Sequence, residues 1–199
     1  MKRKNTIWFI ILLLVIDQVV KIIVKTNMTI NESIPVFGEW FNIRFIENKG
    51  AAFGFQLGGD AGKLILSLFR IFAIGGIIWV IGYFRRHNAP KGVVVGFAMI
   101  LAGAIGNMID SAFYGLIFSP STYTEVATLV PFGEGYAGFL HGMVVDMLYF
   151  PLFSGVYPDW FPFVGGESFT FFSPIFNIAD SYITCAVFYL LIFKYKYFN

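Results

Sequence analysis

Two copies of one short polar pattern are the first candidates for chemistry in this chain. The pattern Asn-x-x-Asp-Ser occurs at Asn107–Ser111 and again at Asn177–Ser181, each time at one end of an apolar run. A spacing of three puts each Asn and its Asp on one face of a helix. A further acid, Asp146, lies between the two copies in the apolar stretch Gly142–Met147, with no Lys or Arg near it in the sequence.

Carboxylic acids in such a setting suit proton-transfer chemistry. Two carboxylates that lie close together in a partly dry site do not both ionise readily, so they share one proton. One then acts as a general base on water, while the other, protonated, polarises a carbonyl group. This is aspartic-protease chemistry. It uses no nucleophilic Ser or Cys and no metal, and we therefore expect no cofactor.

A second polar group lies in the first apolar run. Asp17, Lys21 and Lys25 follow one another at intervals of four and therefore share one helical face. Asp, Lys or Arg at the centre of a membrane helix costs about 2.5–3.5 kcal/mol on insertion scales, and such residues usually mark function. The alternative is structural: an ion pair between Asp17 and Lys21, and interhelical hydrogen bonds for Asn107 and Asp110.

The sequence offers few residues for zinc, Ser–Lys or cysteine chemistry. The chain has two histidines, His87 and His141, and no HExxH pattern, so a zinc site at His141 with carboxylates has little support. A Ser–Lys dyad would need Lys49 or Lys63 to reach the outer serines by long-range folding. The single cysteine, Cys185, lies in an apolar run and indicates neither a disulfide nor redox chemistry.

The elements that must position these groups are membrane-spanning helices. Of the 199 residues, 57% are hydrophobic and only 13% are charged, whereas soluble domains carry about 25% charged residues. Apolar runs of roughly 17–25 residues cross a bilayer as helices, and four runs qualify: 7–24, 64–84, 93–113 and 175–193. We therefore predict an all-α integral membrane protein with four transmembrane helices, which forms one membrane-embedded domain over residues 1–199.

The positions of Lys and Arg predict the orientation of this domain. They cluster before the first span, between the second and third, and after the fourth, and none occurs between Lys91 and Lys194. Cytoplasmic loops are enriched in these residues, so we expect both termini and the loop 85–91 inside, and the segments 25–63 and 114–174 outside. Opposite helix directions then bring the two Asn-x-x-Asp-Ser patterns to one depth. The net charge of +2 gives no indication of a nucleic-acid partner.

The first outer segment predicts a small β-rich subdomain on the outer side. Phe41–Phe45 alternates apolar and polar residues, as a half-buried strand does. Asn48–Gly50 is a turn candidate, and Ala51–Phe55 is expected to return as a second strand.

The second outer segment is too aromatic for a disordered linker. Ser173 and Pro174 are expected to cap and begin the fourth helix. The aromatic residues expected to form a layer at the membrane interface are Phe150, Phe153, Tyr157, Trp160, Phe161 and Phe163. The alternative is a loop packed on itself without membrane contact.

Five motifs follow one another in the chain: Ile16–Lys21, Glu47–Gly54, Gly103–Asp110, Val144–Asp146 and Phe176–Ser181. Together with the four spans, they resemble the bacterial lipoprotein signal peptidases, or signal peptidase II, over nearly the whole chain. The resemblance implies a membrane aspartyl endopeptidase that removes the signal peptide from bacterial prolipoproteins. The implied substrate carries diacylglycerol on its lipobox cysteine and is cut just before that cysteine.

The resemblance also implies roles for individual residues. Asp146 and Asp180 match the catalytic pair of the family. The positions that shape the site or contact substrate and inhibitor are matched by Asp17, Lys21, Asn48, Asn107, Asp110 and Asn177. The implied partners are lipid-modified prolipoproteins, membrane lipids and globomycin-type cyclic peptide inhibitors. The implied location is the bacterial inner (cytoplasmic) membrane, with the active site at the periplasmic face.

The chain departs from the family pattern at two points. Ser111 follows the third-motif Asp, where the family usually has Arg, and this puts a charged contact with the substrate in doubt. The stretch between Asp110 and Asp146 is also much longer than is usual, and we expect it to form an extra outer element.

The residues alone leave two other function classes open. Intramembrane carboxylates also mark ion and proton paths, so a small transporter or channel using Asp17, Asp110 and Asp180 is one alternative. A non-enzymatic assembly factor that binds a partner through its aromatic outer segment is another. Asp146 discriminates among them, because a catalytic pair needs an acid in the outer loop and an ion path does not.

Overall fold

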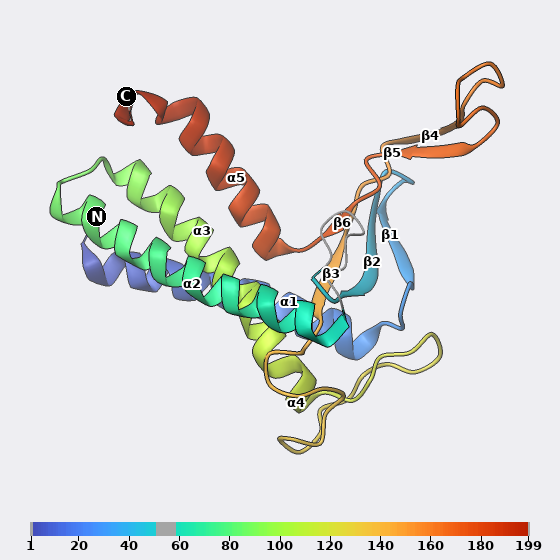
Figure 1. Ribbon diagram of the computed structural model, residues 1–199, viewed down its shortest axis with the longest axis horizontal. Helices are drawn as coiled ribbons and strands as arrows, with labels where there is room; N and C mark the ends of the chain where they lie inside the picture. Colours follow the sequence, from blue (N-terminus) through green and yellow to red (C-terminus); the bar gives the residue numbers. More distant parts are fainter. Residues whose placement is uncertain (1, 51–58, 199) are drawn as a thin grey trace.

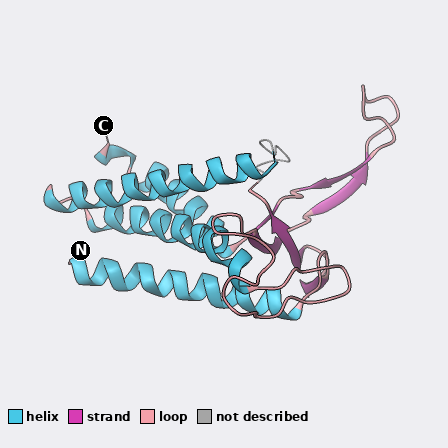
Figure 2. Cartoon of the chain, turned by 60° about the horizontal axis from the view of Figure 1, so that its bottom comes forward, coloured by secondary structure: helices cyan, strands magenta, loops and turns pink. Residues whose placement is uncertain are grey.

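The computed structural model describes residues 2–50 and 59–198. Three long helices, α1 (Arg3–Asn27), α2 (Gly59–Arg86) and α3 (Lys91–Ile109), form a bundle in which α3 contacts both of the others. A shorter helix, α5 (Ile178–Phe193), packs against α3 and runs back along it (Figure 1). The strands lie together at one end of the helices, and both termini lie at the opposite end (Figure 2).

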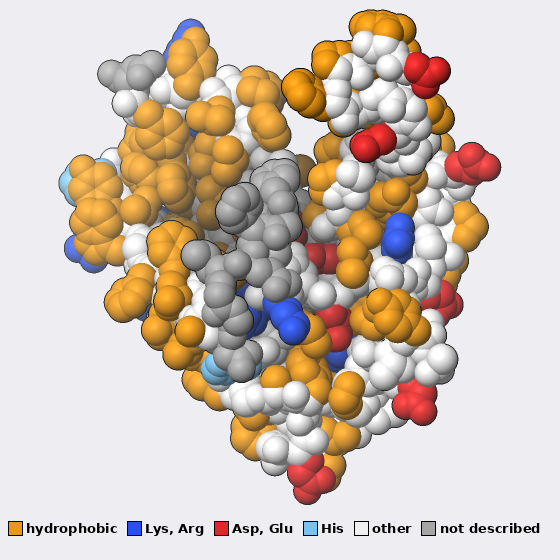
Figure 3. All heavy atoms as spheres, turned by 45° about the vertical axis from the view of Figure 1, so that its right-hand side comes forward, with side chains coloured by type: hydrophobic (Ala, Val, Ile, Leu, Met, Phe, Trp, Pro, Cys, Tyr) orange, Lys and Arg blue, Asp and Glu red, His pale blue; other side chains and the backbone are white. Residues whose placement is uncertain are grey.

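The helices are built to face lipid. Among the described residues, three helical segments are long and apolar enough to cross a membrane: Arg3–Asn27, Ala61–Arg86 and Lys91–Ile117. Hydrophobic side chains cover much of the helical surface (Figure 3). Some Lys and Arg side chains appear at the left of this view, at the end of the helices away from the sheet. The first three predicted spans are therefore confirmed as long apolar helices. The fourth predicted run forms α5, which has 16 residues and starts at Ile178 rather than 175.

The buried face of α1 is unusually polar. It includes Leu13, Asp17, Lys21 and Val24, which recur at helical spacing, whereas the other face exposes Leu12, Val15 and other apolar side chains. A helix that is apolar outside and charged inside suits a bilayer, because the charges must find partners within the protein.

The end of α3 is irregular. After Ile109 the helix widens into a π-helical turn (Asp110–Tyr114) and then a single α turn, α4 (Gly115–Ile117). Such π-helical turns are frequent at functional sites, and this one carries Asp110 and Ser111, both fully buried.

The described residues also form two β-sheets, so the predicted all-α fold class is incomplete. β1 (Ser33–Phe37), β2 (Phe41–Asn48), β3 (Val144–Tyr149) and β6 (Ile175–Phe176) form an antiparallel sheet in the order β1-β2-β3-β6. The predicted β-rich subdomain is confirmed, but β2 pairs with β1 and β3. The second strand expected at 51–55 lies outside the described residues.

Asp146 is on strand β3, opposite Ile46 of β2, so the expectation that it lies in a loop is wrong. The residues from Val144 to Met147 are all buried. A strand buried on both faces shows no alternation of apolar and polar residues, and this is why the sequence did not reveal it.

The long stretch after α4 packs at the end of the helices where the sheet lies. Its backbone is tied to the rest of the protein: Ile30 N donates to Thr122 O at 2.8 Å, and Gly142 N donates to Ser111 O at 2.9 Å. The buried Lys25 adds side-chain contacts, because it pairs with Glu47 and donates to Ser121 Oγ at 3.0 Å. The expected extra element is therefore present as a loop with few regular elements, and its location outside the membrane stays a prediction.

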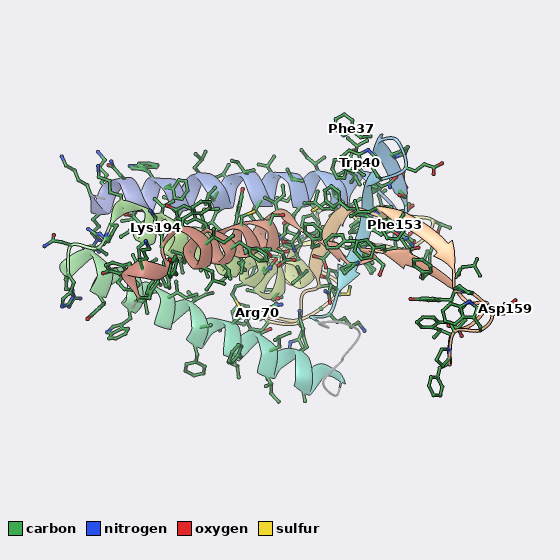
Figure 4. All side chains as sticks on the ribbon, turned by 90° about the horizontal axis from the view of Figure 1, so that it is seen from above. Phe37, Trp40, Arg70, Phe153, Asp159 and Lys194 are labelled. Carbon is green, nitrogen blue, oxygen red and sulfur yellow. The ribbon has the colours of Figure 1, made fainter. Side chains whose placement is uncertain are left out.

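A hairpin of β4 (Phe153–Val156) and β5 (Ser168–Phe171) extends from the sheet away from the helices (Figure 1). Asp159 marks its tip, at the opposite end of the molecule from Lys194 (Figure 4). Trp160 and Phe163 are exposed there. The predicted interfacial role of these aromatic residues stays a prediction.

Candidate active site

The second Asn-x-x-Asp-Ser copy builds the start of α5. Asn177 is the N-cap: its Oδ1 accepts from Asp180 N at 2.9 Å, and the Asp180 carboxylate accepts in return from Asn177 N at 3.4 Å. This reciprocal pair is a capping box with Asp at its third position. The expectation that Ser173 and Pro174 cap this helix is wrong, because β6 intervenes and the Asn side chain supplies the acceptor.

Asn177 also connects the two carboxylates of interest. Its Nδ2 donates to Asp146 Oδ1 at 2.7 Å and to Asn107 Oδ1 at 3.0 Å. Asn107 in turn donates to Asp180 Oδ1 at 2.8 Å. The Asn residues of both sequence copies thus bring Asp180 of α5 and Asp146 of β3 to one place, and we call these two acids the cavity pair.

Behind the cavity pair lies a group of buried charges, Asp17, Lys21 and Asp110, which we call the Lys21 cluster. Lys21 Nζ is 2.8 Å from Asp110 Oδ2 and 3.1 Å from Asp17 Oδ2, and it donates to Asn107 Oδ1 at 2.9 Å. The three donors of the ammonium group are therefore all used. Its two carboxylates do not line the cavity.

Further donors complete the Lys21 cluster. Gln18 Nε2 donates to Asp110 Oδ1 at 3.0 Å and to Asp17 Oδ2 at 3.1 Å. Ala179 N, in the first turn of α5, donates to Asp17 Oδ1 at 3.0 Å. A carboxylate at this place stabilises the positive end of the helix, and the cluster thereby fixes α5 against α1.

Two glycines of α3 allow these helices to approach. A Cβ at Gly106 would lie 2.6 Å from Asp17 Oδ2, and one at Gly103 would lie 2.3 Å from Ala179 O. Any side chain there would push α1 or α5 away from α3 and open the cluster.

Asp146 has an environment that favours its neutral form. Only 3% of its surface is exposed, and burial, followed by the negative charge of Asp180, raises its pKa to about 7. Hydrogen bonds from Asn177 and from Asn48, whose Nδ2 is 3.1 Å from Asp146 Oδ2, partly oppose this rise in pKa. At neutral pH the pair can therefore hold one proton.

Both acids of the cavity pair line a cavity of about 700 Å³ at the sheet end of the helices. Asn48, Arg70 and Asn107 lie in the same wall, which is otherwise mostly apolar. An open cavity that ends on two acids held by amide donors suits the activation of water beside a bound carbonyl group. No group of three metal-binding side chains occurs among the described residues.

Comparison with known proteins identifies the family. The family model described as signal peptidase (SPase) II matches residues 9–196. A lipoprotein signal peptidase of Porphyromonas gingivalis is 50% identical over 184 residues, which cover 92% of this chain and 79% of the relative. One of Amoebophilus asiaticus is 38% identical over 180 residues, covering 89% of this chain and 72% of the relative. The chain belongs to the signal peptidase II family.

A solved structure supports the fold. A chain titled "Bacterial membrane enzyme structure by the in meso method at 1.9 A resolution" superposes with a TM-score of 0.62 at 26% identity, covering 98% of this chain and 94% of that one. Membership in a peptidase family favours the peptidase interpretation over the transporter and the assembly factor, and it makes this protein a membrane-embedded lipoprotein signal peptidase.

The site of this family member contains two polar residues that were not predicted from the sequence, Gln18 and Arg70. It also contains Lys63, which the sequence suggested only as a possible partner of a serine and which donates to Ser111 Oγ at 3.3 Å. Gln18 follows directly after Asp17, within the first family motif. Lys63, Ser67 and Arg70 share one face of α2 by spacing, and Lys63 and Ser67 are buried. The signal was available, because an Arg inside an apolar span is as unusual as Asp17 in the first one.

Proposed function

We propose that this member of the signal peptidase II family is an aspartic endopeptidase and that Asp146 and Asp180 are its catalytic residues. The observation that carries the proposal is that both acids face one cavity, held by Asn107 and Asn177, while none of the ion pairs between described residues includes either. Asp17, Lys21, Asn48, Asn107, Asp110 and Asn177 are proposed to shape this site.

The environments of the two acids suit different roles. Asp146, whose pKa is raised to about 7, holds the shared proton and donates it in a hydrogen bond to the carbonyl oxygen of the scissile peptide. Asp180 lies in the first turn of α5, where the positive helix end favours its charged form. It takes a proton from water as the water oxygen attacks the carbonyl carbon. The proton then passes to the leaving amine as the C–N bond breaks.

The proposed substrate is a bacterial prolipoprotein with a diacylglyceryl cysteine, cut before that cysteine. The cavity lies where the apolar helices end and the sheet begins. A substrate anchored by its lipid chains can therefore keep those chains beside the helices while its peptide enters the cavity. Globomycin-type cyclic peptides are proposed to occupy the same cavity as inhibitors.

The proposed location is the bacterial inner membrane, with all 199 residues in one domain of four spans. Taking α5 as the fourth span, its 16 residues extend about 24 Å at 1.5 Å per residue, and the 3₁₀ turn Tyr195–Tyr197 continues it. The charge bias then puts both termini in the cytoplasm and the cavity at the periplasmic face.

Conservative replacement of the acids tests the proposed function. Asp146→Asn and Asp180→Asn keep the shape of each side chain but remove proton transfer, so each is expected to abolish cleavage of a lipidated precursor in a gel-shift assay. Both variants should still insert into the membrane and purify as wild type does. Full activity in either variant would contradict the assignment of Asp146 and Asp180 as the catalytic residues.

Cysteine labelling tests the orientation. In a Cys185→Ser background, a cysteine replacing Thr122 should react with an impermeant reagent in intact spheroplasts. A cysteine replacing Asn88 should react only after lysis. The reverse pattern would put the cavity on the cytoplasmic side and exclude exported prolipoproteins as substrates.

A further inference from the structure

The wall of the cavity contains a cation that lies outside all five family motifs. Arg70 points from α2 toward the other helices (Figure 4) and lines the cavity with Asp146 and Asp180. Among the described residues in this wall, it is the only Lys or Arg. Its guanidinium lies close enough to Asp110, Asp146 and Asp180 for all three to attract it. Arg70 is therefore the cation that faces the cavity pair.

Ser111 fixes one end of this guanidinium. Arg70 Nη1 donates to Ser111 Oγ at 3.0 Å, and Lys63 Nζ donates to the same oxygen at 3.3 Å. A hydroxyl oxygen accepts two hydrogen bonds, so these two cations occupy it fully. The place beside position 111, where the family usually carries its own Arg, is thus occupied by an Arg that comes from a different helix.

Most of the guanidinium is left for a ligand. An Arg side chain carries five N–H donors in a planar fork and stays charged. Within the described part of the chain, only the donor to Ser111 takes part in a hydrogen bond. Donors at the wall of an open cavity suit the carbonyl oxygens of a peptide, which recur at every residue of an extended backbone.

We propose that Arg70 anchors the substrate backbone. Its free N–H groups donate to a carbonyl oxygen of a residue next to the scissile bond and so position that bond over the cavity pair. Arg70 supplies from α2 the charged contact that Ser111 cannot make. This inference rests on the proposed function, because it takes the peptide to lie across Asp146 and Asp180.

Kinetics of Arg70 variants separate anchoring from a structural role. Arg70→Gln should raise KM for a lipidated precursor about 10- to 100-fold, as expected when a hydrogen bond from a charged group is lost, while kcat changes less. Arg70→Lys keeps the charge but not the fork and should fall between Arg70→Gln and wild type. The matched control is Arg86→Gln, the same replacement on the exposed cytoplasmic end of α2, which should keep the wild-type KM.

Moving the guanidinium gives a second, independent test. Arg70→Ser should lose activity as Arg70→Gln does. The double variant Arg70→Ser/Ser111→Arg should regain at least about tenfold in kcat/KM, since it returns the fork to the same place from the π-helical turn after α3. Should the double variant fail to fold, the order of KM values for Arg70→Lys and Arg70→Gln decides.

The role of Arg70 and the aspartic mechanism are tested by different results. A wild-type KM in Arg70→Gln, or a fall in melting temperature with unchanged KM, overturns the role of Arg70. If Asp146→Asn and Asp180→Asn are inactive in the same assay, the aspartic mechanism stands regardless. If both are active, the proposed function fails, and the anchoring role fails with it.

Discussion

The Lys21 cluster and the cavity pair are built from the same kind of residue but differ in the partners of their acids. In the Lys21 cluster, each carboxylate has an ammonium partner within about the length of a hydrogen bond and at least one further donor. In the cavity pair, the partners of both acids are amide groups, and no ion pair includes either acid among the described residues.

This difference in partners suits the Lys21 cluster to a structural role and the cavity pair to a chemical one. A cation beside a buried carboxylate favours the charged form of that carboxylate. A buried carboxylate with only neutral donors and a like charge nearby has a raised pKa, as Asp146 has. The Lys21 cluster can therefore hold three helices together. The cavity pair, which Asn107 links to Lys21 through two hydrogen bonds, is proposed to exchange protons.

The largest expected effect breaks the Lys21 cluster. Lys21→Met removes the partner of two buried carboxylates, and breaking a buried ion pair in this way costs about 3–5 kcal/mol. We expect a large fall in the melting temperature of the purified protein. Lys21→Met/Asp110→Asn should be more stable than Lys21→Met alone, because one uncompensated charge is gone.

Lys196→Met, at an exposed position near the C-terminus, is the control for the loss of one positive charge and should melt as wild type does. If Lys21→Met also melts as wild type does, the cluster does not hold the helices. The buried charges of the Lys21 cluster would then contribute little to the stability of the fold.

Residue types and spacing predicted the members of both groups, but only the family resemblance divided them into a catalytic pair and supporting residues. Asp17, Lys21, Asn107, Asp110, Asp146, Asn177 and Asp180 all reach one region of the structure. Periodicity brought out the helices because lipid requires long apolar runs. It could not show that Asp110 is paired and Asp146 is not, since that depends on which of them Lys21 reaches across three elements.

Other features escaped the sequence for local reasons. Asp146 looked like a loop residue because a strand buried on both faces has no alternation. Asn177 looked like a partner of Asp180 alone, and its capping of α5 and its bond to Asp146 depend on the close approach of α3 at Gly103 and Gly106. Arg70 was passed over because it lies in none of the five family motifs and has no polar neighbour in the sequence to mark it.

A smaller effect is expected where one residue serves both helix capping and the cavity pair. Asn177→Ala should lose the cap of α5, about 1 kcal/mol, and the donor to Asp146. Asn177→Ser keeps a capping oxygen but is too short to reach Asp146, so it should retain most of the stability and still lose about tenfold in kcat. Melting curves and initial rates on the lipidated precursor would compare the two variants.

Equal losses of kcat and stability in Asn177→Ser would mean that Asn177 acts through the helix alone. Ser181→Ala is a control on the same turn: its hydroxyl donates to Asn177 O at 2.9 Å and touches neither acid of the cavity pair. It should cost some stability, as the loss of one ordinary hydrogen bond does, and leave the rate within about twofold, because both donors of Asn177 and both acids are retained.

The smallest expected effect is a shift of the pH profile. In the proposed mechanism the protonated form of Asp146 is the active one. Its pKa is raised to about 7, so activity should fall as the pH rises through about 7. The native state also binds this proton more tightly than the unfolded chain, where the pKa of Asp is about 4. The free energy of unfolding should therefore decrease as the pH rises from about 4 to about 7, and Asp146→Asn should flatten that slope.

Asn48 allows the position of this limb to be moved. It donates to the Asp146 carboxylate and lowers its pKa, so Asn48→Ala should move the falling limb to higher pH by about 0.5–1 pH unit, the worth of one hydrogen bond. Asn42→Ala, on the same strand and bonded to Glu39 O, is the matched control and should leave the limb in place. A lower rate in Asn48→Ala with an unmoved limb would mean that Asn48 positions substrate and that another group sets the pH dependence. The hydrogen bond from Asn48 would then have no measurable effect on the pKa of Asp146.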